Sequence, residues 1–457
     1  MMKIKIDKQF YRTVFALVLP MALQNLINVA VQSADVVMLG KLDEVSLSAA
    51  SLAGQIQFVL MLICFGLSSG ASVLTAQYWG KGDKKAIERV TMIALRFSMI
   101  ASFLFFLAAE LFPENLMRIF SPDEEVIRLG AEYLRFVAPN YLFVGFTSIY
   151  LNILRSVERV AIAVGVVFSS LCINIVFNTV FIFGFGPIPA LGVAGAAIAT
   201  SLARVVEFII VMIYAKRNRT INLRFKEFFA SHKILLRDFL QYAGPTTINE
   251  LLWGAAIAAT SVIIGHMGSA AVAANSFAQL VRELANVVGF GVANAAAVVV
   301  GKALGAGDKE NAELAAKRML RIGIWFSLFS GSVIFILRTF TSQFVDFFGL
   351  RLTAEAVDYL GFLLLLLSFY VVAQTYNAVM IVGVSRGGGD TRFGLFLDLF
   401  VMWFGSVLFG WLTAFVFKLP VKTVYLIIMM DEFIKLPLCV MRYRKKYWLR
   451  NVTRDNI

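Results

Sequence analysis

The sequence GKGDKK at residues 80–85 recurs as GAGDKE at residues 305–310, a shift of 225 positions. The same shift, applied without a gap, superposes three further proline or glycine pairs: Pro20 on Pro245, Gly40 on Gly265, and Gly66 on Gly291. A chance match would not keep glycine and proline residues in register over about 65 residues. The chain therefore consists of two related halves.

The composition places both halves in a lipid bilayer. Apolar residues make up 59% of the 457 positions, charged residues 16%, and the mean hydropathy is +0.79, which predicts an integral membrane protein. A spanning helix requires about 20 apolar residues. Twelve windows of this kind occur, at residues 13–39, 51–77, 90–112, 132–154, 160–184, 190–215, 239–265, 271–300, 318–338, 355–384, 393–416 and 420–441. A β-barrel would show alternating segments of about ten residues, so the prediction is all-helical.

Six spans in each half return the chain to the side of the membrane where it began. Two six-helix lobes are therefore expected to share one orientation, related by a pseudo-two-fold axis along the membrane normal. The first lobe is expected to cover residues 1–215 and the second residues 239–457. Residues 216–238 are basic and form the expected cytoplasmic linker, which either anchors the topology or forms an amphipathic interfacial helix.

The distribution of basic residues predicts the orientation. Of the 42 Lys and Arg residues, about 30 fall in the N-terminus, the even-numbered loops and the C-terminal tail. This asymmetry accounts for the net charge of +13 without a nucleic-acid partner. It predicts a multi-pass protein of the cytoplasmic (inner) membrane with both termini in the cytoplasm. The start, MMKIKIDKQFYR, leads into a full-length span, so no removable signal peptide is expected.

Motifs for enzymatic chemistry are missing from the sequence. It contains no phosphate-binding P-loop, no HExxH zinc motif and no GxSxG nucleophile elbow. Cys64, Cys172 and Cys439 lie in apolar spans without a disulfide or metal pattern. SRGGGD at residues 385–390 follows a helical window and predicts a turn. We therefore expect a protein that is not an enzyme, binds no cofactor and draws its energy from an ion gradient.

Four polar side chains are expected at similar depth in the outer half of the first lobe: Asp35, Asn174, Asn178 and Thr200. Each lies about four to ten residues from the outer end of its span. One carboxylate with amide and hydroxyl oxygens suits a hard cation such as Na⁺, and equally a carboxyl group that binds and releases a proton. The alternative is that the two asparagines hydrogen-bond neighbouring helices and serve only the packing.

The second lobe does not repeat this chemistry, because the 225-residue shift places Thr260 opposite Asp35. Its charged residues are expected near the middle of the bilayer: Glu250, Arg282, Glu283, Asp431, Glu432 and Lys435. An ionisable residue at that depth is costly and is a functional hypothesis by default. The set is therefore a candidate substrate-binding or charge network.

Several pairings within the spans are expected from spacing. Two same-helix pairs have three- and four-residue spacing: Arg204 with Glu207, and Asp431 with Lys435. Glu250 is expected either to bind a proton or to serve as the counter-ion of Arg282. Asp398, about six residues from the cytoplasmic end of its span, is expected to be a shallow partner for loop arginines.

Four features together carry a resemblance to a known family. These are LP followed 15 residues later by Asp35, the GxGD loops after the second and eighth spans, NIVFNTVFIFG at residues 174–184, and SRGGGD after the tenth span. In combination, and over nearly the whole chain, they resemble the multidrug and toxic compound extrusion (MATE) family of transporters. The resemblance implies export of organic cations or other amphipathic compounds in exchange for Na⁺ or H⁺.

The same resemblance implies roles for single residues. Asp35 matches the coupling aspartate of the family, and Pro20 matches its bend-forming proline. Asn174 and Thr200 match supporting polar residues, and Glu250 matches a glutamate of the seventh helix found in one branch. Alternating access between two lobes would then carry the substrate across the membrane.

One departure from the family pattern leaves the coupling ion open. Many relatives read N-x-x-x-D in the fifth helix, whereas this chain has Asn174 and Asn178. The site keeps its spacing and loses one negative charge. A Na⁺ site at Asp35, Asn174, Asn178 and Thr200 would attract the ion more weakly. The loss also removes a like-charge neighbour of Asp35.

The sequence gives the least information about the substrate. Forty-two Phe and 16 Met residues offer deformable apolar lining for amphipathic or cationic small molecules, alongside contacts with the bilayer lipids. The chain is expected to act as a monomer. Two alternatives are a flippase for lipids or lipid-linked oligosaccharides of the same broader superfamily, and a receptor or channel for which Asp35 and Glu250 are dispensable.

Overall fold

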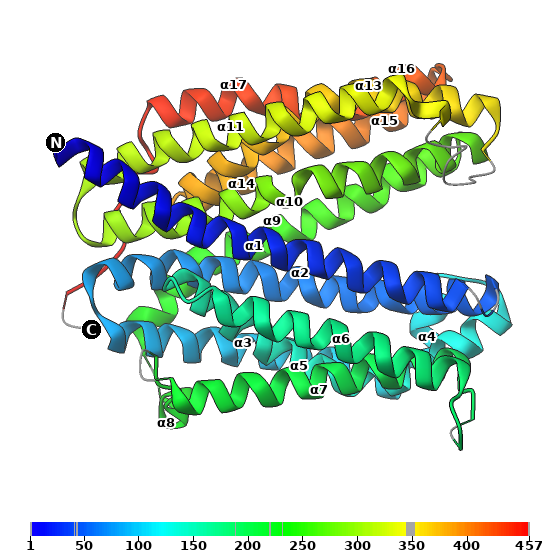
Figure 1. Cartoon of the computed structure of the whole chain (residues 1–457), viewed down its shortest axis with the longest axis horizontal. Helices are drawn as coiled ribbons and strands as arrows, with labels where there is room; N and C mark the ends of the chain where they lie inside the picture. The colour runs from blue at the N-terminus through cyan, green and yellow to red at the C-terminus, as the bar shows by residue number, and fades with distance from the viewer. Residues whose placement is uncertain are drawn as a thin grey trace. The chain divides into compact units, whose positions relative to one another are not determined.

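The computed structural model of the chain confirms the all-helical prediction (Figure 1). It describes residues 2–40, 42, 44–187, 189–218, 221–230, 232–343 and 352–455, without the side chains of residues 2–7, 32–37, 40, 44, 225 and 226. Within these ranges every regular element is a helix, and eleven helical segments are long and apolar enough to cross a membrane.

These segments follow the predicted windows. Nine are single α-helices: α1 (Met2–Gly40), α2 (Glu44–Lys81), α3 (Lys84–Leu111), α5 (Glu124–Ser156), α6 (Ala161–Phe183), α7 (Gly192–Arg217), α9 (Lys233–Gly265), α10 (Ser269–Gly305) and α11 (Lys309–Thr339). Two include π-helical segments: α13 (Ala354–Ala378) with η1 (Val379–Ser385), and α14 (Thr391–Asp398) with η2 (Leu399–Leu408), α15 (Phe409–Trp411) and η3 (Leu412–Val416). Short helices α4 (Pro113–Arg118) and α8 (Phe225–Phe229) lie between spans.

The twelfth window, predicted as one continuous span over 420–441, is instead two helices. They are α16 (Val421–Ile428) and α17 (Asp431–Arg444). At the break the amide of Met430 donates to the carbonyl of Ile427, a tighter turn than the α-helix makes. The carbonyl oxygen of Ile428 accepts a hydrogen bond of 2.6 Å from the hydroxyl of Ser406 on η2. This contact from another helix satisfies a carbonyl that the interrupted helix leaves unpaired.

The chain forms two compact units. Unit 1 contains Met1–Ala22 and Ile248–Thr453, and unit 2 contains Leu23–Thr247 and Arg454–Ile457. The units differ from the predicted lobes in placing the first 22 residues with the second half of the chain. The division falls inside α1, two residues after Pro20, and α1 continues as a helix through that proline.

The glycines matched by the internal repeat have matching packing roles. A Cβ atom on Gly66 would lie 2.3 Å from the Cα atom of Thr247 within unit 2. A Cβ atom on Gly291 would lie 3.3 Å from the backbone nitrogen of Ala22 within unit 1. Thr247 is itself the 225-residue counterpart of Ala22. In each unit, glycine thus lets one helix approach the backbone of another, and the duplication extends to helix packing.

The repeated GxGD loops are turns that end one helix and begin the next. Gly82 and Gly307 have φ angles of +82° and +80°, a conformation that glycine adopts without strain. The following aspartates cap the next helices: Asp83 accepts a 3.0 Å hydrogen bond from the amide of Ala86, and Asp308 accepts one of 3.0 Å from the amide of Asn311. In both units these loops therefore have a structural role, since they turn the chain and cap the next helix.

We expect Gly195→Ala to weaken the packing of α7 against α6. A Cβ atom on Gly195 would lie 2.3 Å from the carbonyl oxygen of Phe181, and this backbone atom cannot move without shifting the helix. Overpacking of this kind costs about 1–3 kcal/mol. The measurement is the thermal midpoint of the purified protein in detergent. Gly165→Ala on α6 is the matched control, because no atom lies within 4 Å of a Cβ atom there. Equal midpoints for the two variants would contradict the prediction.

Candidate functional site

Unit 2 brings together three of the four polar residues predicted for the first lobe. Asn174 and Asn178 lie one turn apart on α6, and Thr200 lies on the adjacent helix α7. The amide nitrogen of Asn178 donates to the Asn174 side-chain oxygen at 3.1 Å, and the amide nitrogen of Asn174 donates to the Thr200 hydroxyl oxygen at 3.3 Å. Asn174 is 2% exposed and Asn178 is fully buried. The polar chain is therefore shielded from solvent and joins two helices.

The fourth member of this set, Asp35, belongs to α1, but its side chain lies outside the described residues. The described members are neutral and offer amide and hydroxyl oxygens. Their hydrogen bonds fit the structural alternative, since amide groups commonly join membrane helices. The same oxygens are suitable ligands for a hard cation beside a carboxylate. The ion-binding role of Asp35, Asn174, Asn178 and Thr200 stays a prediction.

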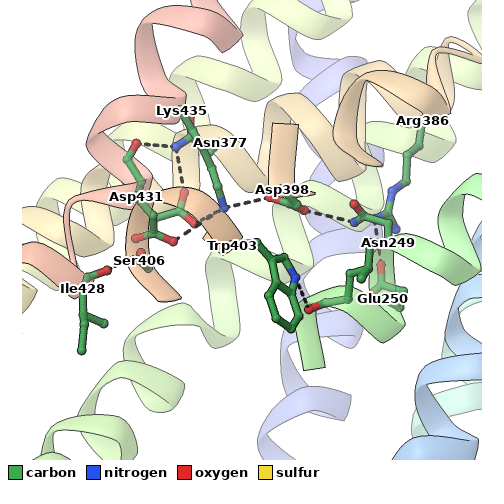
Figure 2. Close-up of polar contacts among 12 residues, drawn as sticks. Asn249, Glu250, Asn377, Arg386, Asp398, Trp403, Ser406, Ile428, Asp431 and Lys435 are labelled. Atoms are coloured by element: carbon green, nitrogen blue, oxygen red, sulfur yellow. Dashed lines mark hydrogen bonds and ion pairs between the residues drawn. The ribbon is translucent and has the colours of Figure 1, made fainter. Parts of the chain in front are cut away.

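Unit 1 contains a buried charge network centred on Lys435 of α17 (Figure 2). The ammonium nitrogen lies 2.8 Å from Asp398 Oδ1, 3.1 Å from Glu432 Oε1 and 3.7 Å from Asp431 Oδ2. The Lys435 residue is only 2% exposed. One cation thus holds three carboxylates inside the unit, at a depth where each isolated charge would be costly.

Amide side chains extend the network on both sides of Lys435. The amide nitrogen of Asn249 on α9 donates to Asp398 Oδ2 at 3.1 Å. The amide nitrogen of Asn377 on α13 donates to Glu432 Oε2 at 2.8 Å and to the Glu432 carbonyl at 2.7 Å. These contacts fix two of the three carboxylates from a second direction.

A separate buried ion pair joins α9 to the end of the tenth span. Glu250 Oε1 lies 2.7 Å from Arg386 Nη2, and both residues are at least nine-tenths buried. Glu250 directly follows Asn249 on α9, so the pair adjoins the Lys435 network along the same helix (Figure 2). Asp398 and Glu250 are close enough to repel each other electrostatically.

Irregular helix geometry positions these charged groups. Arg386 follows the π-helical segment η1, and Asp398 is the last residue of α14 before the π-helical segment η2. Asp431 and Glu432 form the first turn of α17, directly after the break in the twelfth span. Carboxylates are favoured there by the positive end of the helix dipole. Wider π turns are frequent at functional sites because they reorient side chains within a helix.

Two of the predicted pairings are confirmed. Lys435 contacts Asp431 four residues earlier, and Arg204 lies 2.6 Å from Glu207. The Asp398 prediction is wrong: this residue is 8% exposed and contacts Lys435 because α14 directs it into the unit instead of toward the loops.

The proposed pairing of Glu250 with Arg282 is also wrong, because Arg386 occupies that position. Arg282 instead lines a cavity of about 70 Å³ together with Thr260, the counterpart of Asp35. Among the described residues, Arg282 has no ion-pair partner, and Glu283 is exposed. Arg386 was missed because SRGGGD was interpreted as a turn. An arginine next to a span was the signal that could have identified it.

The fold and these buried charges define a duplicated, multi-pass membrane protein with ionisable groups inside its spans, which is the class of membrane transporters. The MatE family model matches residues 20–180 and 245–412, one match in each half. The chain therefore belongs to the multidrug and toxic compound extrusion family, as its motifs predicted.

Relatives are similar over most of their length. The chain is 25% identical to "Probable multidrug resistance protein YoeA" of Bacillus subtilis, covering 86% of this chain and 84% of that protein. It is 26% identical to "Probable multidrug resistance protein NorM" of Bradyrhizobium diazoefficiens, covering 94% and 92%. Among solved structures, a MOP superfamily transporter from Pyrococcus furiosus has a TM-score of 0.85 at 22% identity, covering 95% of both chains. That likeness establishes the fold.

Proposed function

We propose that the protein is a cation-coupled antiporter, driven by H⁺ or Na⁺, that exports organic cations and other amphipathic compounds by alternating access. It acts as a monomer in the cytoplasmic membrane with both termini in the cytoplasm. Ion binding in unit 2 favours one access state, and the exported compound favours the other. Coupling of this kind requires that the ion binds the two states with different affinity.

The observation that carries the proposal is the hydrogen-bonded chain of Asn178, Asn174 and Thr200 on α6 and α7, in which both asparagines are buried. By the family resemblance, Asn174 and Thr200 match supporting positions of the ion-coupling site, Asn178 stands where many relatives have aspartate, and Asp35 of α1 would be the coupling aspartate. A cluster of three neutral groups can complete the coordination of Na⁺ or hydrogen-bond a carboxyl group that carries a proton. The second acidic position, Glu250, lies in unit 1 with Arg386 as its counter-ion.

An apolar cavity in unit 1 supports the substrate class. It has a volume of about 750 Å³ and is lined mainly by aromatic and aliphatic side chains of α9, η2, α15 and η3. The lining includes Trp403, Trp411 and Phe415, whose ring faces attract cations. Cavities of this size and character accept drug-sized amphipathic molecules. The names of the NorM and YoeA relatives point to the same class.

We expect efflux of ethidium from proteoliposomes under one of two separately imposed gradients, H⁺ or Na⁺. The gradient that drives export identifies the coupling ion, because only the coupled ion can shift the balance between the access states. Liposomes without protein are the control. Absence of transport under both gradients would contradict the proposal and favour the flippase alternative.

A further inference from the structure

The charges buried in unit 1 do not balance. The ionisable groups of the Lys435 network and of the adjoining ion pair are Glu250, Asp398, Asp431 and Glu432 on the acidic side and Arg386 and Lys435 on the basic side. Arg282 of α10 lies close enough to interact electrostatically with buried Tyr370 of α13, as do Asp431, Glu432 and Lys435. Four carboxylates therefore face three cations, even when Arg282 is counted. An uncompensated negative charge in a membrane span is strongly disfavoured.

Unused hydrogen-bond acceptors in the same network provide an independent observation. Among the described residues, none donates to Asp431 Oδ1, Asn249 Oδ1 or Asn377 Oδ1. These residues are 4%, 4% and 1% exposed, so water does not readily reach them. Each atom is an acceptor, and a buried acceptor without a donor costs about 1–3 kcal/mol. The buried groups therefore lack both a compensating positive charge and hydrogen-bond donors.

Asp431 is the carboxylate that its surroundings stabilise least as an anion. Asp398 is held by Asn249 and by a 2.8 Å contact with Lys435. Glu432 is held by Asn377 and by a 3.1 Å contact with the same lysine. Asp431 Oδ2 lies 3.7 Å from the lysine, beyond hydrogen-bond distance, and its Oδ1 has no partner among the described residues. Excess charge is most easily removed at this residue.

We propose that the Lys435 network binds one proton, carried by Asp431. The proton balances four carboxylates against three cations and converts Asp431 from an acceptor without a donor into a hydrogen-bond donor. A metal ion fits the geometry less well, because Lys435 already occupies the point where the three carboxylates converge. The described residues also contain no acidic, histidine or cysteine group arranged to hold a metal. This site goes beyond the proposed coupling at Asp35 and does not depend on which compound is exported.

Asp431 lies next to the break in the twelfth span, so its protonation state can affect the conformation of the helix there. Asp431 begins α17 immediately after the turn at Met429 and Met430, where the Ile428 carbonyl is held by Ser406. Release of the proton would place a second full charge beside Glu432 in the same helical turn. Both carboxyl groups lie near the same lysine nitrogen, at 3.7 and 3.1 Å, so two full charges there repel. The interrupted turn before α17 is the part of the helix that can yield. The protonation state of Asp431 thus acts on a discontinuous helix.

The test is infrared difference spectroscopy of the purified full-length protein in detergent, which requires neither substrate nor gradient. The difference between the spectra at acidic and at alkaline pH is expected to contain the carbonyl band of a buried carboxyl group that is protonated at acidic pH. Asp431→Asn is expected to abolish this band. Glu432→Gln leaves three carboxylates facing three cations and is expected to shift the titration of the band to lower pH. Asp358→Asn is the matched control, because Asp358 forms an exposed pair with Lys422 at 2.7 Å in the same unit.

Several outcomes would overturn the proposal. A band that persists in Asp431→Asn, or one that titrates at an unchanged pH in Glu432→Gln, places the proton elsewhere. If Asp431→Asn does not fold, wild-type protein labelled with ¹³C at the aspartate carboxyl carbon shows whether the band comes from an aspartate. A band that fails to shift on labelling excludes an aspartate. Failure of ethidium export leaves all these readouts unchanged, so the two proposals fail separately.

Discussion

Replacing Lys435 by methionine is expected to prevent stable folding or to lower stability severely. Methionine keeps the length and apolar stem of lysine but removes the ammonium group that contacts Asp398, Glu432 and Asp431 at 2.8, 3.1 and 3.7 Å. Breaking a buried ion pair by removing one partner costs about 3–5 kcal/mol, because the other charge is left uncompensated. Here three carboxylates lose their shared cation, so the upper part of that range is expected.

The measurement is the yield of monodisperse protein in detergent and its thermal midpoint. Lys422→Met is the matched control, since Lys422 pairs with Asp358 while both side chains are at least 40% exposed. An exposed pair contributes only about 0–1 kcal/mol. Adding Asp398→Asn to Lys435→Met is expected to recover part of the lost stability, because it removes one of the uncompensated charges. A Lys435→Met protein as stable as wild type would show that the network is not held by this lysine.

The features that the membrane itself imposes on the chain could be predicted from the sequence. Eleven predicted spans correspond to described helices, because a spanning helix must be long and apolar wherever it packs. The two copies aligned by the repeat also share local structure: Gly82 and Gly307 adopt the same left-handed turn, and Asp83 and Asp308 cap the helices that follow. These features depend on backbone geometry within a few residues and are therefore visible in one chain.

The candidate sites were less predictable because they depend on contacts between distant segments. Short spacing correctly paired Asp431 with Lys435, but Glu250 and Arg386 are 136 residues apart. Nothing in the sequence distinguishes the π-helical turns that position Arg386 and Asp398. The break before α17 likewise depends on Ser406 from another helix. An apolar window predicts that a segment crosses the membrane, and not how its helix is interrupted.

The comparison between the two units explains why the halves of a duplicated chain can differ in chemistry. Packing positions such as Gly66 and Gly291 keep matching roles because they set how closely helices approach. Polar positions carry no such constraint: Thr260 stands at the counterpart of Asp35 and lines a small cavity with Arg282. The duplicated scaffold thus leaves each unit free to carry its own buried polar network.

Export is expected to fall by about 5- to 150-fold in Asp35→Asn, because the coupling free energy between ion and substrate, typically about 1–3 kcal/mol, is lost with the charge. The described polar residues of that site, Asn174, Asn178 and Thr200, are neutral and cannot replace it. Gradient-driven ethidium efflux from proteoliposomes measures the effect. Asp123→Asn is the matched control in unit 2, since Asp123 caps α5 on the surface and asparagine is an equally good cap.

Glu250→Gln is expected to impair export as well, and stability separates the two variants. Removing the Glu250 charge leaves Arg386, 2.7 Å away and buried, without its counter-ion, which costs about 3–5 kcal/mol. Asp35→Asn is expected to keep the wild-type thermal midpoint while losing transport. Full gradient-driven efflux in Asp35→Asn would place the coupling outside the unit 2 cluster, and its three hydrogen-bonded side chains would then serve the packing of α6 against α7. Loss of efflux without loss of stability would instead identify Asp35 as the residue through which the ion acts.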